Sequence, residues 1–155
     1  MINTEKIFNE LVRFNNDMDV GVFLGKFVSM NEKGMITFDG ATGDFDIFIS
    51  SALKDYEKMK ALAHETGHIR ADFSTVLSRP FVKEMGENRA ENWACTYIIK
   101  YADLVGVLKN WRITNDFEAA EELHVDVETL RKATRRYELE GKPVKQWQFR
   151  ECWGT

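Results

Sequence analysis

Between Glu84 and Lys109, apolar and aromatic residues recur three or four positions apart without interruption. This spacing predicts one long helix with a continuous buried stripe, and the rest of the chain must supply the surface that covers it. The stripe consists of Ala90, Trp93, Ala94, Tyr97, Tyr101, Leu104, Val105 and Leu108.

Further helices are predicted from periodicity and from capping residues. One covers Thr4–Phe14, with Asn3 or Thr4 as its cap, and another is capped by Ser50 or Ser51 and runs to about Ala71. Asn115 and Glu118 form a capping-box pattern that opens a short helix. Asp126 caps a last helix over residues 127–140, and Gly141 and Pro143 end it.

Three β-rich segments precede the second helix. The runs "VGVFLGKFVSM" and "MITF" flank "NEKG", a turn composition that predicts a hairpin. "FDIFIS" alternates apolar and polar residues and is expected to be a third strand at an edge, where an extended substrate or another strand of the chain could pair with it. The segment "FSTVLSRPFVK" is expected to be a loop because it contains Pro80.

These elements predict an α+β fold: a small antiparallel sheet near the N-terminus followed by a mostly helical part. A chain of 155 residues has room for one core, so we expect a single domain over 1–155. Within it, 1–50 holds the first helix and the strands, 51–110 the two long helices, and 111–155 a helical part with an aromatic tail. That tail contains Trp147, Phe149 and Trp153 and is expected to dock on the domain or on a partner.

Composition narrows the functional class. The net charge of −4 gives no global attraction to nucleic acid or to an anionic membrane, so neither is an expected partner. Two cysteines, Cys95 and Cys152, are too few for a disulfide framework and suit a reducing compartment. With no signal peptide and no long apolar run, we expect a soluble cytoplasmic protein.

The stretch "ALAHETGHIRAD" carries two of the three histidines of the chain, His64 and His68. Four residues apart on a helix, they lie on one face and can bind one metal ion. Glu65 lies roughly 100° further around the axis, where it can act as a general base beside the ion rather than as a ligand. This is the His-Glu-x-x-His pattern of zinc hydrolases; the alternative is an ordinary exposed helix with two incidental histidines.

A catalytic zinc site needs a third protein ligand. Glu87 and Glu91, in "GENRAENWA", lie on or beside the apolar stripe, where a carboxylate needs a compensating charge. We therefore predict Glu87 as the third ligand and Glu91 as a carboxylate that holds the far ring nitrogen of a histidine. The alternative for both is an ion pair with an arginine or a lysine, and a similar ligand set can also hold iron.

Together, "LAHETGHI" and "ENRAENWA" resemble the ImmA/IrrE family of zinc metallo-endopeptidases, which are often encoded by prophages and other mobile elements. The family typically shows a His-Glu-Leu-Gly-His core followed by a Glu-x-x-Ala-Asn-x-Phe-Ala helix. Glu91 stands at the usual Asn or Asp position, and "CTYIIKYADL" departs from the family's usual continuation.

The resemblance implies a zincin-like cytoplasmic protease that cleaves a specific protein, in several relatives a transcriptional repressor. The expected chemistry is zinc-assisted amide hydrolysis, in which Glu65 takes a proton from water and delivers it to the leaving amine. Tyr97 and Tyr56 are conceivable oxyanion donors, although packing in the core is the favoured interpretation of both.

Two other functions remain open. The segment "FEAAEELHVDVETLRKATRRYEL" has the spacing of a helix-turn-helix, with His124 at the turn and a basic second helix, but many glutamates surround its arginines and lysines. The other alternative is a non-catalytic binder, in which zinc serves as a structural clamp or belongs to an anti-repressor that works by contact.

Overall fold

The computed structural model describes residues 1–27, 32–71 and 80–144. The predicted aromatic tail lies outside these ranges. The chain forms two compact units: residues 3–94 form one, and residues 1–2 with 95–155 form the other. The boundary falls inside a helix, α3, and the single domain expected from the sequence stays a prediction.

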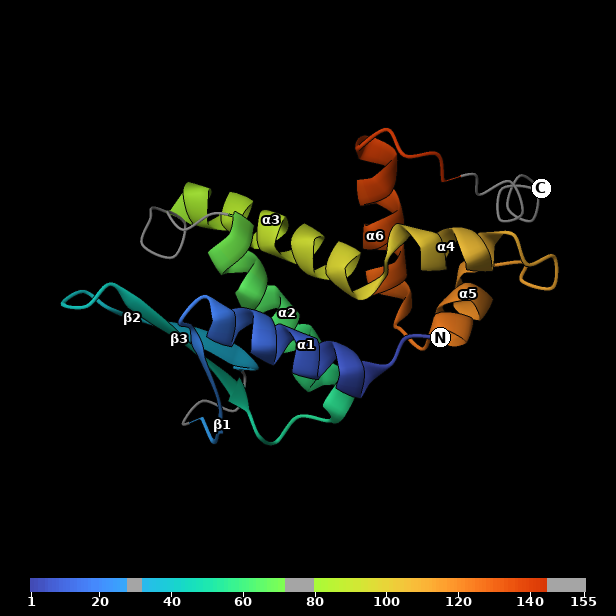
Figure 1. Ribbon diagram of the computed structural model, residues 1–155. Coiled ribbons are helices and arrows are strands. Elements are labelled where there is room, and N and C mark those ends of the chain that lie inside the picture. Colours follow the sequence, from blue (N-terminus) through green and yellow to red (C-terminus); the bar gives the residue numbers. More distant parts are fainter. Residues whose placement is uncertain (28–31, 72–79, 145–155) are drawn as a thin grey trace. The chain divides into compact units, whose positions relative to one another are not determined.

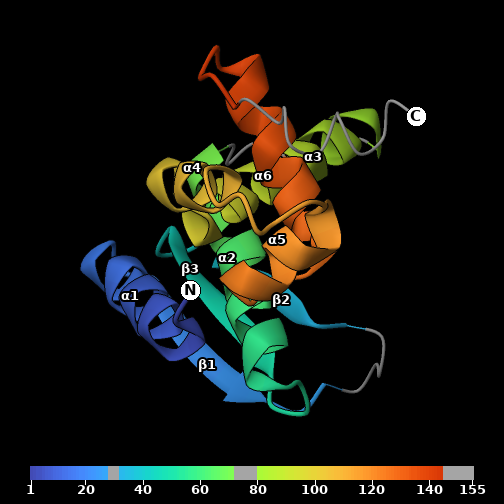
Figure 2. The ribbon, with the colours of Figure 1, turned by 90° about the vertical axis from the view of Figure 1, so that its right-hand side faces the viewer.

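The first unit contains α1 (Thr4–Asp17), β1 (Gly21–Gly25), β2 (Gly34–Asp39), β3 (Asp44–Ser50), α2 (Asp55–Ala71) and most of α3 (Pro80–Ile98). α1 and α2 lie against one face of the sheet (Figures 1 and 2). The fully buried side chains at this interface include Leu11, Ile47, Ile49, Met59 and Leu62. The α+β class expected from the sequence is confirmed.

The sheet is mixed, in the order β1-β3-β2, with β1 parallel and β2 antiparallel to β3. The expected antiparallel sheet and the hairpin between the first two strands are therefore wrong. The hairpin joins β2 to β3 instead, through a turn in which Gly43 adopts a φ of +76° that favours glycine. β3 is central and paired on both sides, so "FDIFIS" cannot accept a substrate strand.

Two helix boundaries also differ from the prediction. Ser50 and Ser51 do not cap α2, because the helix begins only at Asp55, and the Ser50 side chain accepts a hydrogen bond from the Ala52 N–H instead. α3 starts at Pro80, inside the expected loop, where proline suits the first turn of a helix because it lacks an N–H group.

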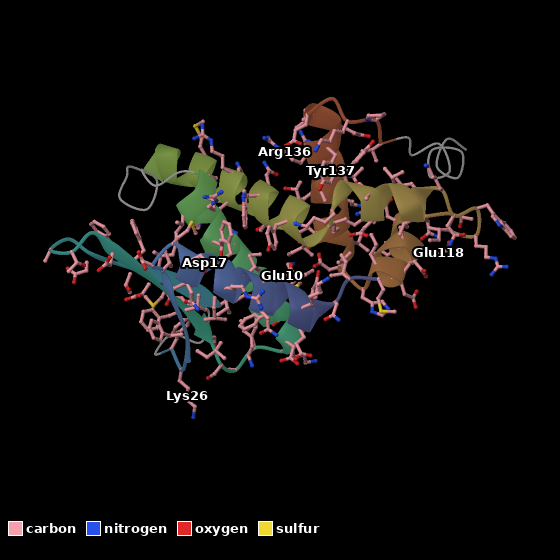
Figure 3. The ribbon with its side chains drawn as sticks, in the orientation of Figure 1. Glu10, Asp17, Lys26, Glu118, Arg136 and Tyr137 are labelled. Atoms are coloured by element: carbon pink, nitrogen blue, oxygen red, sulfur yellow. The ribbon has the colours of Figure 1, made fainter. Side chains whose placement is uncertain are left out.

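The second unit contains the end of α3, α4 (Tyr101–Leu108), α5 (Asp116–Leu123) and α6 (Val127–Leu139). The long helix expected over 84–109 is broken at residues 99–100. Tyr137, labelled on α6 in Figure 3, has its hydroxyl 2.7 Å from the Ile99 carbonyl oxygen and 3.1 Å from that of Thr96, so its O–H satisfies carbonyls at the end of α3.

The predicted caps of three helices are present. The side chains of Asn3, Asn115 and Asp126 accept hydrogen bonds from the backbone N–H groups three residues ahead. Within the described ranges, none of the helices combines the length and the apolar composition needed to cross a bilayer.

Candidate metal centre

α2 and the first part of α3 cross at a point where their backbones nearly touch. A Cβ atom added at Gly67 would lie 2.5 Å from the Ala90 carbonyl oxygen, so only glycine fits at this position. Gly67 lies next to His68 on α2, and Ala90 stands between Glu87 and Glu91 on α3. Figure 1 shows the two helices, and their close crossing brings the two pairs of candidate site residues together.

Three of these side chains turn their donor atoms toward one point. His64 Nε2 lies 2.9 Å from Glu87 Oε2, and His68 Nε2 lies 3.2 Å from Glu87 Oε1. The two Nε2 atoms are themselves 3.2 Å apart. Tetrahedral zinc with arms of about 2.0–2.1 Å separates its ligand atoms by about 3.3 Å, so this donor set fits the ion.

The contact of Glu91 fixes the tautomer of His64. Glu91 Oε2 lies 2.8 Å from His64 Nδ1, and because an ionised carboxylate only accepts hydrogen bonds, Nδ1 must be the donor. In a neutral His64, Nε2 then presents a lone pair to the Glu87 carboxylate, and two acceptors face each other. The arrangement is favourable only when a positive charge, a proton or a metal ion, lies between them.

The electrostatics of His64 agree with this requirement. Burial lowers the pKa of His64, but the hydrogen bond to Glu91 and the negative charges of Glu65, Glu91 and Glu87 outweigh burial and raise the pKa above 6.5. The site thus attracts positive charge. Among the described residues, His64, His68 and Glu87 are the only group of three His, Cys, Asp or Glu side chains arranged closely enough to hold a metal ion.

Glu65 lies beside this cluster, against the start of β2. A Cβ atom at Gly34 would lie 3.0 Å from Glu65 Cγ and 3.1 Å from its Oε1, so the glycine leaves room for the carboxylate. Burial raises the pKa of Glu65 to about 7, against the lowering effect of His64 and with a smaller contribution from Glu87. A carboxyl group with a pKa near neutrality can both accept and return a proton.

The cluster is reachable from solvent on one side. The His68 side chain is only 10 % exposed, whereas that of Glu87 is 46 % exposed. A structural zinc site usually has four protein ligands and is closed, whereas the described part of the chain brings three donors together here.

The predicted site residues on α2 and α3 are therefore brought together, and Glu91 contacts a histidine nitrogen as expected. Tyr97 belongs to the other unit, where Lys100 Nζ lies 3.8 Å from its ring centroid, so its role as an oxyanion donor stays a prediction. Tyr56 lies two turns before His64, about 12 Å along the helix axis.

Sequence reasoning missed two supporting residues. Gly34 is the first residue of β2 and leaves room for the Glu65 side chain. In the sequence, the only indication of this role is that a glycine precedes an apolar run. Asn15, at the end of α1, donates through Nδ2 to Thr66 Oγ1 at 2.9 Å, a buried bond that ties α1 to the histidine helix. No local pattern predicts such a contact, because 51 residues separate the two partners.

A short turn joins α5 to α6, and His124 adopts the left-handed conformation expected at this turn. On α6, Arg131 pairs with Asp116, Lys132 with Glu128 and Arg136 with Glu140. DNA binding by these helices stays a hypothesis.

Searches against protein-family models, curated proteins and solved structures find no match to this chain.

Proposed function

We propose that the protein is a zinc-dependent endopeptidase, of the kind that the resemblance to the ImmA/IrrE family implies, and that it acts in the cytoplasm on a specific protein such as the repressor of a mobile element. The observation that carries the proposal is the convergence of His64 Nε2, His68 Nε2 and the Glu87 carboxylate beside Glu65. In this arrangement the three donors hold the metal, and Glu91 orients His64.

His64, His68 and Glu87 would hold the zinc ion, which would act there as a Lewis acid toward water and the scissile carbonyl group. Two further roles, proton transfer and the orientation of a ligand, belong to side chains of the protein. Glu65, which lies beside the donor set and against Gly34, accepts a proton from the attacking water and returns it to the leaving amine. Glu91 keeps the proton of His64 on Nδ1, so that Nε2 stays available as a ligand.

The sheet offers a place for an extended polypeptide. β2 is an edge strand, and its first residue, Gly34, contacts Glu65. A peptide that pairs with β2 would run past the general base, and main-chain hydrogen bonds would hold it there. This assigns to β2 the substrate pairing that the sequence suggested for β3.

The experiment is to purify the full chain without chelators or metal-binding tags, measure its zinc content by elemental mass spectrometry, and incubate it with a proteome-derived peptide library. We expect about one zinc ion per chain and cleavage products that Glu65→Gln does not generate. Glu65→Gln removes the base but no ligand, so this variant should retain zinc.

The outcomes separate the alternatives. A chain that binds no zinc even after incubation with it refutes the proposed centre. Zinc binding without cleavage, together with a biological effect that survives Glu65→Gln, indicates an anti-repressor that works by contact.

A further inference from the structure

The other edge of the sheet is β1, and within residues 1–27, 32–71 and 80–144 the only strand that pairs with it is β3. Its sequence, Gly-Val-Phe-Leu-Gly, contains no charged residue and no proline, and Phe23 and Leu24 are 49 % and 53 % exposed. Natural edge strands usually carry a charge, a proline or a bulge that prevents pairing with another strand. An apolar, regular edge of this kind is suited to a β-strand partner.

The backbone groups at this edge can be assigned from the hydrogen bonds of β1. Gly25 turns its carbonyl toward the sheet, since it accepts from Ser51 N–H at 2.9 Å. Successive residues of a strand point their N–H and C=O groups to opposite sides, so Phe23 and Gly21 also face β3. Val22 and Leu24 therefore present their N–H and C=O groups to the free edge.

We propose that β1 pairs with β1 of a second copy of this chain, in antiparallel orientation about a two-fold axis at Phe23. In this register Val22 of one copy lies opposite Leu24 of the other. Both residues have outward-facing backbone groups, so each pair exchanges two hydrogen bonds and the axis generates the second pair. The strand is complementary to itself, as an isologous interface requires.

The side chains fit the same register. Phe23 of the two copies meet at the axis as a non-hydrogen-bonded pair, the closely spaced kind in an antiparallel ladder. Each Phe23 already stacks on Phe48 of its own chain, with ring centroids 5.3 Å apart, and Phe48 pairs in register with Met35. The side chains of Phe23, Phe48 and Met35 form a row on the sheet face opposite α1 and α2. Pairing of the two β1 strands would extend this row across both copies.

Two glycines keep the edge unobstructed. A Cβ atom at Gly21 would lie 2.7 Å from the Phe23 ring, so the glycine lets the ring lie flat along the strand. Around Gly25, no described residue other than its two chain neighbours comes within 4 Å of the added Cβ position. The proposed register places Gly21 of one copy opposite Gly25 of the other, where no side chain hinders their approach.

Charges at the two ends of β1 are complementary. Asp19 precedes the strand and Lys26 follows it, and Lys26 extends away from the end of β1 (Figure 3). Antiparallel pairing about Phe23 brings Lys26 of one copy to the end where Asp19 of the other copy lies. Parallel pairing would instead bring like charges together, which favours the antiparallel orientation.

The resulting sheet has six strands in the order β2-β3-β1-β1-β3-β2. Both β2 edges, each beside a Glu65, remain at its outer sides, so pairing leaves the candidate metal centres accessible. The proposed pairing uses only the edge of β1, so it does not depend on whether the protein is a peptidase.

Sedimentation equilibrium of the full chain tests the proposal. One short strand pair is at the small end of specific interfaces, so we expect a dimer with a Kd of about 1–100 µM. Phe23→Lys places two ammonium groups opposite each other at the axis and should raise Kd at least tenfold. Phe38→Lys is the matched control: Phe38 is 42 % exposed on β2 and also packs on a neighbouring phenylalanine, Phe45, at 4.8 Å.

Two further variants guard against a folding defect. Val22→Pro removes an N–H group that faces the free edge, so it should abolish pairing and leave the bonds to β3 intact. A mixture of Phe23→Lys and Phe23→Glu should associate although each variant alone is monomeric, because opposite charges then meet at the axis. A wild type that stays monomeric to about 200 µM, a dimer insensitive to Phe23→Lys, or a dimer lost equally in Phe38→Lys would overturn the proposal.

Discussion

The replacement Gly67→Ala tests what sets the spacing of the metal donors. The added Cβ would lie 2.5 Å from the Ala90 carbonyl oxygen and 3.0 Å from its carbonyl carbon and Cα. All three are backbone atoms, so no change of rotamer relieves the overlap. α2 and α3 must separate by about 0.5 Å or more before the contact is tolerable.

That separation acts directly on the cluster. Glu87 and Glu91 flank Ala90 on α3, and their contacts with His64 are 2.9 Å and 2.8 Å long. We expect the affinity for zinc to fall about 10–100-fold, the usual effect of disturbing a ligand's support, and overpacking to cost about 1–3 kcal/mol of stability. Competition with a fluorescent zinc chelator and urea unfolding measure the two effects.

Gly106→Ala is the matched control. Gly106 lies in α4, and a Cβ atom added there would have no described residue outside its own helix turn within 4 Å. Replacing glycine by alanine inside a helix stabilises it by about 0.5–1 kcal/mol, so this variant should gain stability and bind zinc normally. If Gly67→Ala also gained stability and kept the wild-type affinity, the close crossing would not be what positions the donors.

Three further predictions concern single side chains. Glu91→Gln should weaken zinc binding about 10–100-fold in the chelator assay, because His64 loses the carboxylate that holds its tautomer. In the metal-free protein, burial raises the pKa of Glu65 from 4.5 to about 7, so its stabilising contribution is complete below pH 4.5 and is lost as the pH rises through 7. Urea unfolding at several pH values should therefore show the wild type losing up to about 3 kcal/mol relative to Glu65→Gln across this range; parallel curves would contradict the assignment. Tyr137→Phe should lower the free energy of unfolding by about 1–3 kcal/mol, because the buried Ile99 carbonyl loses its donor; an unchanged value would contradict this role.

The resemblance of the two motif helices to a peptidase family and the geometry of the cluster are separate lines of support for the proposed function. The first comes from residue identities in the sequence, and the second from atom positions. Both lines of support include Glu87. It lies 23 residues from His64 in the chain, and its Oε2 atom lies 2.9 Å from His64 Nε2.

Local interactions made part of this structure predictable from the sequence. The caps Asn3, Asn115 and Asp126 bond to residues three positions ahead, so their patterns carry the information for the helix starts. The pair His64 and His68 shares a helix face by spacing alone. Glu87 and Glu91 could be inferred because a carboxylate on an apolar stripe needs a partner.

Tertiary structure decided what depends on residues far apart in the chain. The strands lie in the order β1-β3-β2, which places β3, with the fully buried Ile47 and Ile49, in the centre of the sheet. The alternation of apolar and polar residues within one strand does not indicate which strands lie beside it. The break after α3 occurs at Ile99 and Lys100 without a glycine or proline, where the hydroxyl of Tyr137 satisfies carbonyls that a continuous helix would have used itself. The spacing of the metal donors likewise depends on Gly67 meeting Ala90, a contact that exists only once the two helices cross.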